Sequence, residues 1–140
     1  IGGFNGGEIP YEMMKQVLRE SRVYVYAGSW PASYTLSFIE ALMTGIPLVV
    51  ASKRITQNAD LEQFDFYEAD EIVKNEESGF VCENVIQMRN CIERMLKDPE
   101  SAKIIGERGR QKAIEEFGKE KIKLQWKNFL EKGGEHVSTN

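Results

Sequence analysis

The segment spanning residues 23–51 constrains the fold more than any other part of the chain. Its β-branched and aromatic start, residues 23–27, is typical of a short strand that runs into a glycine turn. Apolar residues at helical spacing follow over residues 35–44, and Gly45 is placed to end this helix in a left-handed cap. The near-continuous apolar run of residues 46–52 then indicates a parallel strand that is covered on both faces.

The remaining segments extend this alternation of helices and strands. We expect a helix over residues 10–21 with Met13, Met14, Val17 and Leu18 on one face, and a third strand over residues 79–82. Three helices should follow, beginning at Asn84, Asp98 and Lys119. Val85, Met88, Ile92, Met95 and Leu96 line one face of the first, and Ile104, Ile105, Ala113 and Ile114 are expected to face inward on the second. The last carries an apolar stripe of Ile122, Trp126, Phe129 and Leu130. The pattern is that of a doubly wound α/β half-domain with a helical C-terminal flank.

Residues 53–75 are mixed and polar, and they predict a long loop with short helical turns. Leu61, Phe64, Phe66 and Tyr67 are the apolar residues expected to hold this loop on the body. The acidic triplet Glu68-Ala69-Asp70 superficially suggests a metal site, but no third ligand is in view. A solvated charge run is favoured, and we expect no metal.

Composition excludes several functional classes. The chain has 140 residues and a net charge of −4, so one domain is expected and nucleic acid is a poor candidate partner. The single histidine, His136, lies in a polar tail, which argues against Ser-His-Asp, Cys-His and His-ligated zinc chemistry. Cys82 and Cys91 occupy apolar positions and are expected to be buried, reduced thiols. The apolar runs are too short to span a bilayer and no signal peptide is apparent, so a cytoplasmic location is expected.

A ligand site is expected where the first strand enters the following helix. Ligands of this sheet type bind at the carboxyl ends of parallel strands, and a helix N-terminus there offers free amides. The turn begins at Gly28 and Ser29, and the candidate pyrophosphate donors are the amides of Ser33, Tyr34, Thr35, Leu36 and Ser37. These polar residues could equally serve only to cap the helix. Trp30, in the same turn, could stack on a base or plug the loop.

Glu40 is the candidate acid of this site. Helical spacing places it with Leu36 and Met43, beside residues expected to face the core. A carboxylate in such a position needs hydrogen-bond donors, and ribose hydroxyls would supply them. The alternative is a capping box, in which Glu40 accepts a hydrogen bond from the Ser37 amide. Arg108 and Arg110 belong to a helix face whose charges are largely balanced, and we assign no function there.

The stretch from residue 29 to residue 50 resembles the nucleotide-sugar signature of family 4 (group 1) glycosyltransferases. In that signature two glutamates separated by seven residues open a helix that ends in Gly-x-Pro and a valine-rich strand. Here the second acid is Glu40 and the Gly-x-Pro is Gly45-Ile46-Pro47, whereas Ala32 stands at the position of the first acid. Residues 71–74, 78–81, 96–100, 105–110 and 116–117 also match the usual ending of the family, so the likeness runs from about residue 13 to residue 130.

The resemblance implies a Rossmann-like half-domain of a two-Rossmann-domain (GT-B type) glycosyltransferase, three-layered and truncated at its N-terminus. Residues 1–133 would form the C-terminal nucleotide-sugar-binding domain and residues 134–140 a disordered tail. The family members transfer a sugar with retention from a nucleoside diphosphate donor to an acceptor, here unknown. In the family the first acid faces the donor sugar and the second faces the ribose. No cofactor or metal is implied.

Two rival interpretations and one oligomeric expectation remain. Ala32 in place of the sugar-facing acid suits a non-catalytic module kept for assembly or regulation. A sugar-nucleotide epimerase uses a similar turn and glutamate, but it would need further acids and a histidine that this chain lacks. The glycine-rich start and the missing acceptor domain suggest a fragment that is inactive alone. Its bare strand edge and the apolar face of its last helix predict a homodimer.

Overall fold

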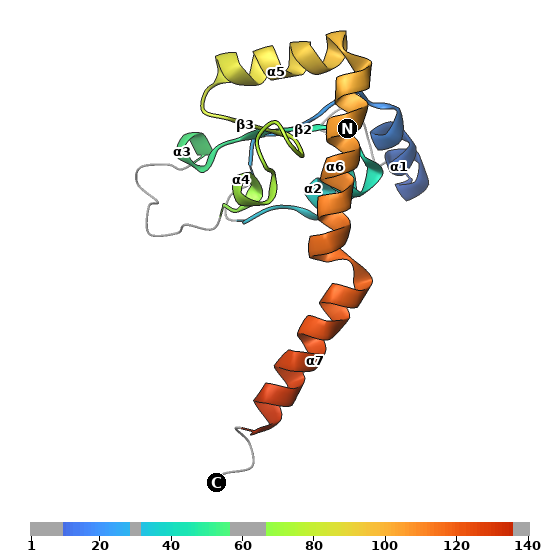
Figure 1. The fold of residues 1–140 in the computed structure, drawn as a ribbon, viewed down its shortest axis with the longest axis vertical. Coiled ribbons are helices and arrows are strands. Elements are labelled where there is room, and N and C mark those ends of the chain that lie inside the picture. The colour runs from blue at the N-terminus through green and yellow to red at the C-terminus, as the bar shows by residue number, and fades with distance from the viewer. Residues whose placement is uncertain (1–9, 29–31, 57–66, 136–140) are drawn as a thin grey trace.

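A parallel three-stranded sheet lies at the centre of the fold in the computed structural model, which describes residues 10–28, 32–56 and 67–135, with side chains to residue 132 (Figure 1). The strands are β1 (Tyr24–Tyr26), β2 (Leu48–Ala51) and β3 (Phe80–Cys82), in the order β1-β2-β3. The register places Val25 beside Val49, and Val50 beside Val81. The α/β class and the parallel sheet predicted from the sequence are therefore confirmed.

Helices connect the strands and form the flank. They are α1 (Tyr11–Glu20), α2 (Leu36–Thr44), α3 (Lys53–Thr56), α4 (Ala69–Ile72), α5 (Val85–Lys97), α6 (Pro99–Phe117) and α7 (Lys119–Glu135). The predicted positions of the long helices are confirmed, and α3 and α4 are the short helical turns expected in the polar segment. The expected anchors Leu61, Phe64 and Phe66 lie outside the described residues.

The two faces of the sheet carry two apolar clusters. On one face, Leu48 and Val50 of β2 pack with Phe38 and Leu42 of α2. On the other face, Val49 packs with residues of β3, α5 and α6, namely Phe80, Cys82, Met95, Ala102 and Ile105. Every residue of β2 is buried, which confirms that this strand is covered on both sides. Each large side chain that is fully buried in this way contributes about 1.5–3 kcal/mol.

Local signals place the helix ends where the sequence predicts them. Gly45 adopts the left-handed conformation, with φ 77°, and ends α2. The Asn84 side chain accepts a hydrogen bond from the Gln87 amide (2.9 Å), and the Gln87 side chain accepts one from the Glu83 amide (2.7 Å). The Asp98 carboxylate accepts a hydrogen bond from the Ser101 amide (3.0 Å) at the start of α6.

The predicted inward faces are only partly correct. Leu36 is 79% exposed and Val85 77% exposed, and Met13, Leu96, Ile104 and Ile114 are also exposed. The buried positions of α6 instead include two glycines, Gly106 and Gly109. A helix that packs by close backbone approach buries its small residues, so the large neighbours of these glycines turn outward.

The backbone of helix α6 packs directly against the backbone of the turn after α2. A Cβ atom on Gly106 would lie 1.9 Å from the Gly45 carbonyl oxygen, and one on Gly109 would lie 2.7 Å from the Ser78 carbonyl oxygen. The Arg110 guanidinium also donates to the Met43 carbonyl oxygen (3.1 Å) near the end of α2. The view of Arg110 as part of a purely solvated face is therefore wrong, because its side chain joins two helices.

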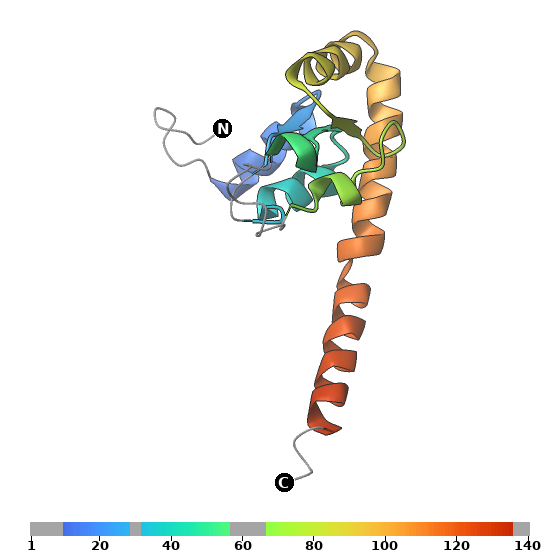
Figure 2. The same cartoon turned by 90° about the vertical axis from the view of Figure 1, so that its left-hand side faces the viewer.

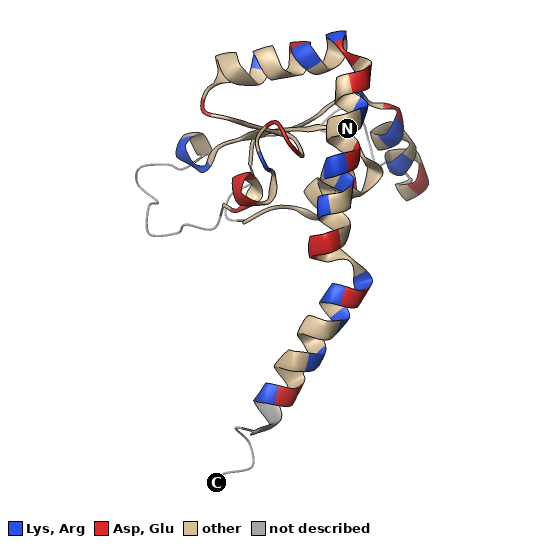
Figure 3. Cartoon of the chain, viewed as in Figure 1, with Lys and Arg blue, Asp and Glu red and all other residues tan. Residues whose placement is uncertain are grey.

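Helix α7 extends away from the sheet and its flanking helices (Figures 1 and 2). Its predicted apolar residues are on the surface, with Trp126 60%, Phe129 68% and Leu130 65% exposed. Residues of both charge signs are spread along α6 and α7 (Figure 3). None of the described helices is both long enough and apolar enough to cross a membrane. The homodimer predicted from the apolar face of this helix stays a prediction.

The glycine contact yields a stability prediction. Replacing an interior helical glycine by alanine ordinarily stabilises a protein by about 1 kcal/mol. Gly106→Ala should instead lower the free energy of unfolding by about 3 kcal/mol or more, because the new methyl group overlaps the Gly45 carbonyl. Gly109→Ala should cost less, and Lys103→Ala, on the exposed side of α6, should change little. Urea denaturation of the four proteins measures these differences, and a Gly106→Ala protein as stable as the parent would contradict the contact.

Candidate functional site

The carboxyl ends of the three parallel strands meet at one edge of the sheet. There β1 leads to Gly28, β2 to Ser52 and β3 to Glu83. Gly28 has φ 91°, and a Cβ atom on it would lie 3.1 Å from Thr56 and 3.2 Å from Tyr67. The turn after β1 therefore passes close to α3 and to the segment before α4, as a glycine permits.

A polar network ties the ends of β2 and β3 together. The Ser52 hydroxyl donates to the Glu83 carboxylate (2.9 Å), and the Ser52 amide donates to the Cys82 carbonyl (2.8 Å). The Arg54 guanidinium donates to the same carboxylate (2.7 Å) and to the Glu83 carbonyl (3.0 Å). The hydrogen bond from Arg54, followed by that from Ser52, holds the pKa of Glu83 below its ordinary value.

A second set of contacts fixes the segment before α4 to the end of β2. The Tyr67 hydroxyl donates to the Ala51 carbonyl (2.6 Å), and the Lys53 amide donates to the Asp70 carboxylate (2.6 Å). Burial, and then the nearby Asp70 charge, raise the pKa of Tyr67 well above its usual range. Asp70 of the acidic triplet thus caps the start of α3. Among the described residues, no group of three potential metal ligands is found.

The start of α2 lies on the same side of the sheet. Because β1 and β2 are parallel, α2 must run back from the carboxyl edge toward the start of β2. Its cap residue is Thr35, whose hydroxyl hydrogen-bonds to the Ser37 hydroxyl (2.7 Å) and not to a helix amide. The amides of Leu36 and Ser37, in the first turn, have no acceptor within the helix. These two amides are the donors available to an anion at this helix end.

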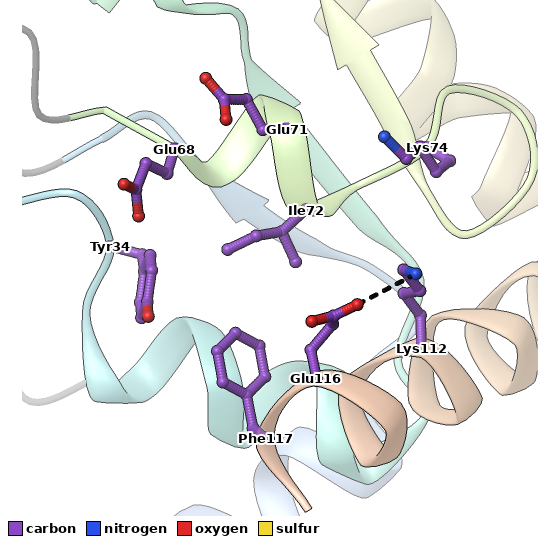
Figure 4. A pocket seen from close by; sticks show the side chains of 8 residues that line it. All are labelled: Tyr34, Glu68, Glu71, Ile72, Lys74, Lys112, Glu116 and Phe117. Atoms are coloured by element: carbon purple, nitrogen blue, oxygen red, sulfur yellow. Dashed lines mark ion pairs between the residues drawn. The ribbon is translucent and has the colours of Figure 1, made fainter. Parts of the chain in front are cut away.

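Tyr34 has a packing role. Its ring lies 5.7 Å from the Phe117 ring and 6.0 Å from the Phe38 ring, measured between centroids. It also lines a pocket of about 330 Å³ between the start of α2, α4 and the end of α6 (Figure 4). The other lining residues are Glu68, Glu71, Ile72, Lys74, Lys112, Glu116 and Phe117. Ser33 is tied to the same region, because its carbonyl accepts a hydrogen bond from the Glu68 amide (3.2 Å).

Glu40 occupies an unexpected position on α2. The buried face of the helix consists of Phe38, Ala41 and Leu42, and at 100° per residue Glu40 lies on the far side, near exposed Leu36. Of the two residues expected on its side of the helix, Met43 packs against the core, whereas Leu36 is turned outward. Glu40 is nevertheless half-buried, and it has no hydrogen-bond or ion-pair partner among the described residues.

The capping box is not formed. Helix α2 begins at Leu36, one residue before Ser37, and no hydrogen bond joins the Ser37 amide to Glu40 in the described part of the chain. With Thr35 as the cap, the box would require Glu or Gln at position 38, which is Phe38. The competing role for Glu40 within the helix is therefore excluded.

The structure brings some predicted site residues to one edge and leaves others outside its description. Gly28 and the amides of Leu36 and Ser37 lie on the carboxyl side of the sheet, whereas Ser29 and Trp30 lie outside the described residues. Sequence reasoning missed Ser52, Arg54 and Glu83. Their positions in the sequence could have indicated them, because Ser52 and Glu83 directly follow β2 and β3. Ligand-binding residues of parallel sheets gather at such strand ends.

Comparison with known proteins identifies the fold. No protein-family profile matches the chain, and no curated protein matches it significantly. Among solved structures, it resembles sucrose-phosphate synthase from Thermosynechococcus elongatus, with a TM-score of 0.68 and 23% sequence identity. The match covers 90% of this chain and 29% of the length of that protein. A likeness at this identity shows that the two share a fold, and the Rossmann-like half-domain with its helical flank is confirmed.

The Glu83 network predicts a pH dependence of stability. A carboxylate whose folded-state pKa is lowered contributes stability above its ordinary pKa and loses it as the pH falls through the folded value. The stability difference between the parent and Glu83→Gln should therefore favour the parent at neutral pH and disappear at acid pH. Urea unfolding at a series of pH values measures this difference. Glu77→Gln, an exposed change of the same kind, is the control, and an equal pH profile for both variants would contradict the network.

Proposed function

We propose that this chain is the donor-side part of a glycosyltransferase that binds a nucleoside diphosphate sugar at the carboxyl edge of its sheet. The observation that carries the proposal is the start of α2, which follows a parallel strand. There two amides and the carboxylate of Glu40 have no partner among the residues that the structure describes. Amides and a carboxylate are what a ligand with both phosphates and sugar hydroxyls requires.

Most of the predicted residues have a role in this proposal. The amides of Leu36 and Ser37 donate to the pyrophosphate, with the polar residues Ser33 and Thr35 beside them. Glu40 accepts hydrogen bonds from the ribose hydroxyls. Gly28 lets the turn after β1 come close to the ligand.

The fold likeness supports the general class of function. The solved structure that the chain resembles is a sucrose-phosphate synthase, and the likeness covers 90% of this chain. The sequence resemblance to family 4 glycosyltransferases adds Glu40 and Gly45-Ile46-Pro47 at matching positions. Retention of configuration belongs to the same proposal, and no metal is included in it.

Transfer itself would need more than this part of the fold. Donor and acceptor must be held together with water excluded, which in two-domain transferases happens in a cleft between domains. The chain spans only 29% of the length of the structure it resembles. Binding of the donor is therefore the property to test on this chain, and transfer is a property of the whole protein.

Glu40→Gln should weaken nucleotide binding. A charge-assisted hydrogen bond becomes a neutral one to the glutamine amide oxygen, which should cost about 1 kcal/mol, roughly a 5-fold rise in Kd. Isothermal titration calorimetry of the chain with UDP, GDP and ADP measures this change. The matched control is Glu77→Gln, which makes the same charge change in an exposed turn. Equal affinities of the parent and Glu40→Gln for all three nucleotides would exclude the ribose role.

The alternative, a non-catalytic module, rests on Ala32. In the resembled family the residue at this position is the acid that faces the donor sugar, and alanine cannot accept a hydrogen bond from it. If the site otherwise holds a sugar nucleotide, Ala32→Glu should tighten the binding of nucleotide sugars by about 10-fold and leave the free nucleotides unchanged.

The comparison of UDP-glucose with UDP in the same titrations distinguishes the two functions. Tighter binding of the sugar nucleotide alone would support a donor site that has lost one contact. No binding of any nucleotide by the parent or by Ala32→Glu would favour the module, because a donor site would then be absent.

A further inference from the structure

The two cysteines of the chain lie side by side. Cys82 ends β3 and Cys91 lies in the middle of α5, and their sulfur atoms are 3.8 Å apart. The expectation that both are buried holds for Cys82, whereas Cys91 is only half-buried. The sequence contains no other cysteine. Any intramolecular disulfide in this chain must therefore join these two residues.

The turn between β3 and α5 fixes this juxtaposition. The Gln87 amide donates to the Asn84 side chain and the Glu83 amide donates to the Gln87 side chain, which sets the first turn of α5. Met95, further along the helix, is fully buried. Cys91 lies between these two anchors and packs in the same apolar cluster as Cys82. A disulfide requires the sulfur atoms to approach to about 2.05 Å, a shift that side-chain rotation can supply from a contact distance.

The two thiols differ in access. Cys82 is 1% exposed, whereas Cys91 is half-buried and reaches solvent. Burial, and then the neighbouring Cys91, raise the pKa of Cys82 to about 12. A thiol of this kind is a poor target for reagents from solution, because the thiolate is the reacting form. Oxidation must therefore begin at Cys91.

We propose that Cys82 and Cys91 form a reversible disulfide when the protein meets a low-molecular-weight disulfide such as oxidised glutathione. The Cys91 thiolate attacks one sulfur of the oxidant, the oxidant's S–S bond breaks, and one glutathione thiolate leaves. The Cys82 sulfur then attacks the Cys91 sulfur of the mixed disulfide and expels the second glutathione. Its proton passes to the departing thiolate. Two protein thiols are oxidised and one small disulfide is reduced to two thiols.

The short distance between the two sulfur atoms favours attack by Cys82 on the mixed disulfide, so the mixed disulfide should not accumulate. Although the Cys82 thiol is weakly acidic, it is held at contact distance from the sulfur that it attacks, which gives it a high effective concentration. The product would link the end of β3 to α5, directly beside Glu83 and its contacts with Ser52 and Arg54. This inference does not depend on the proposed function.

The test is oxidation of the intact chain with oxidised glutathione, followed by thiol counting and mass spectrometry. We expect both thiols to be lost, the mass to fall by about 2 Da, and the protein to remain monomeric on a non-reducing gel. Dithiothreitol should restore both thiols. Alkylation of the native reduced protein with N-ethylmaleimide should modify Cys91 first.

Single variants identify the pathway. Cys82→Ala should stop at the mixed disulfide, with glutathione retained on Cys91. Cys91→Ser should resist oxidation, and circular dichroism of both variants establishes that they are folded. A parent protein that also stops at one bound glutathione, or that forms only intermolecular dimers, would overturn the proposal. So would native alkylation that reaches Cys82 before Cys91.

Discussion

The backbone contact between α6 and the turn after α2 is the constraint on which the rest of the fold depends. At Gly106 the helix lies against the Gly45 carbonyl, and one turn later Gly109 lies against the Ser78 carbonyl. One helix therefore sets the position of the turn that leads into β2 and of the turn that leads into β3. Because Arg110 also binds the Met43 carbonyl, the same helix holds the end of α2. The alignment of the strands, and hence of their carboxyl ends, follows from this contact.

The carboxyl edge of the sheet has two parts that differ in how far their polar groups are paired. The ends of β2 and β3 are already engaged with each other, because Glu83 satisfies both Ser52 and Arg54. At the start of α2 the polar groups are not engaged in this way, since the first amides lack acceptors and Glu40 lacks a described partner. Groups that satisfy one another maintain geometry, whereas unsatisfied groups retain capacity for a ligand. This contrast locates the proposed donor site on the α2 side of the edge.

Sequence alone predicts what depends on neighbours in the chain. Gly45, Asn84 and Asp98 end or begin helices as expected, because capping involves residues only a few positions apart. The environment of Glu40 was not predictable in the same way, since the side of α2 that becomes buried is chosen by packing against the sheet and α6. The bond from Arg110 to Met43 spans 67 positions, and no local pattern contains it. Leu36 and Val85 lie in the predicted helices but are exposed. Apolar spacing thus identifies a helix more reliably than it identifies the face that becomes buried.

The extended position of α7 also determines what optical probes of this protein report. The start of α7 is tied to α6 by the Lys121–Glu116 ion pair, whereas the residues that follow are exposed, so this part of the helix opens without the sheet having to unfold. Trp126 lies on this helix and is 60% exposed, whereas Tyr26 and Tyr67 stack within the core. The emission of Trp126 therefore follows the last helix, and the tyrosines follow the folded body. Once the second tryptophan is removed, as in Trp30→Phe, unfolding curves recorded through Trp126 and through these tyrosines would describe two separate transitions of one chain.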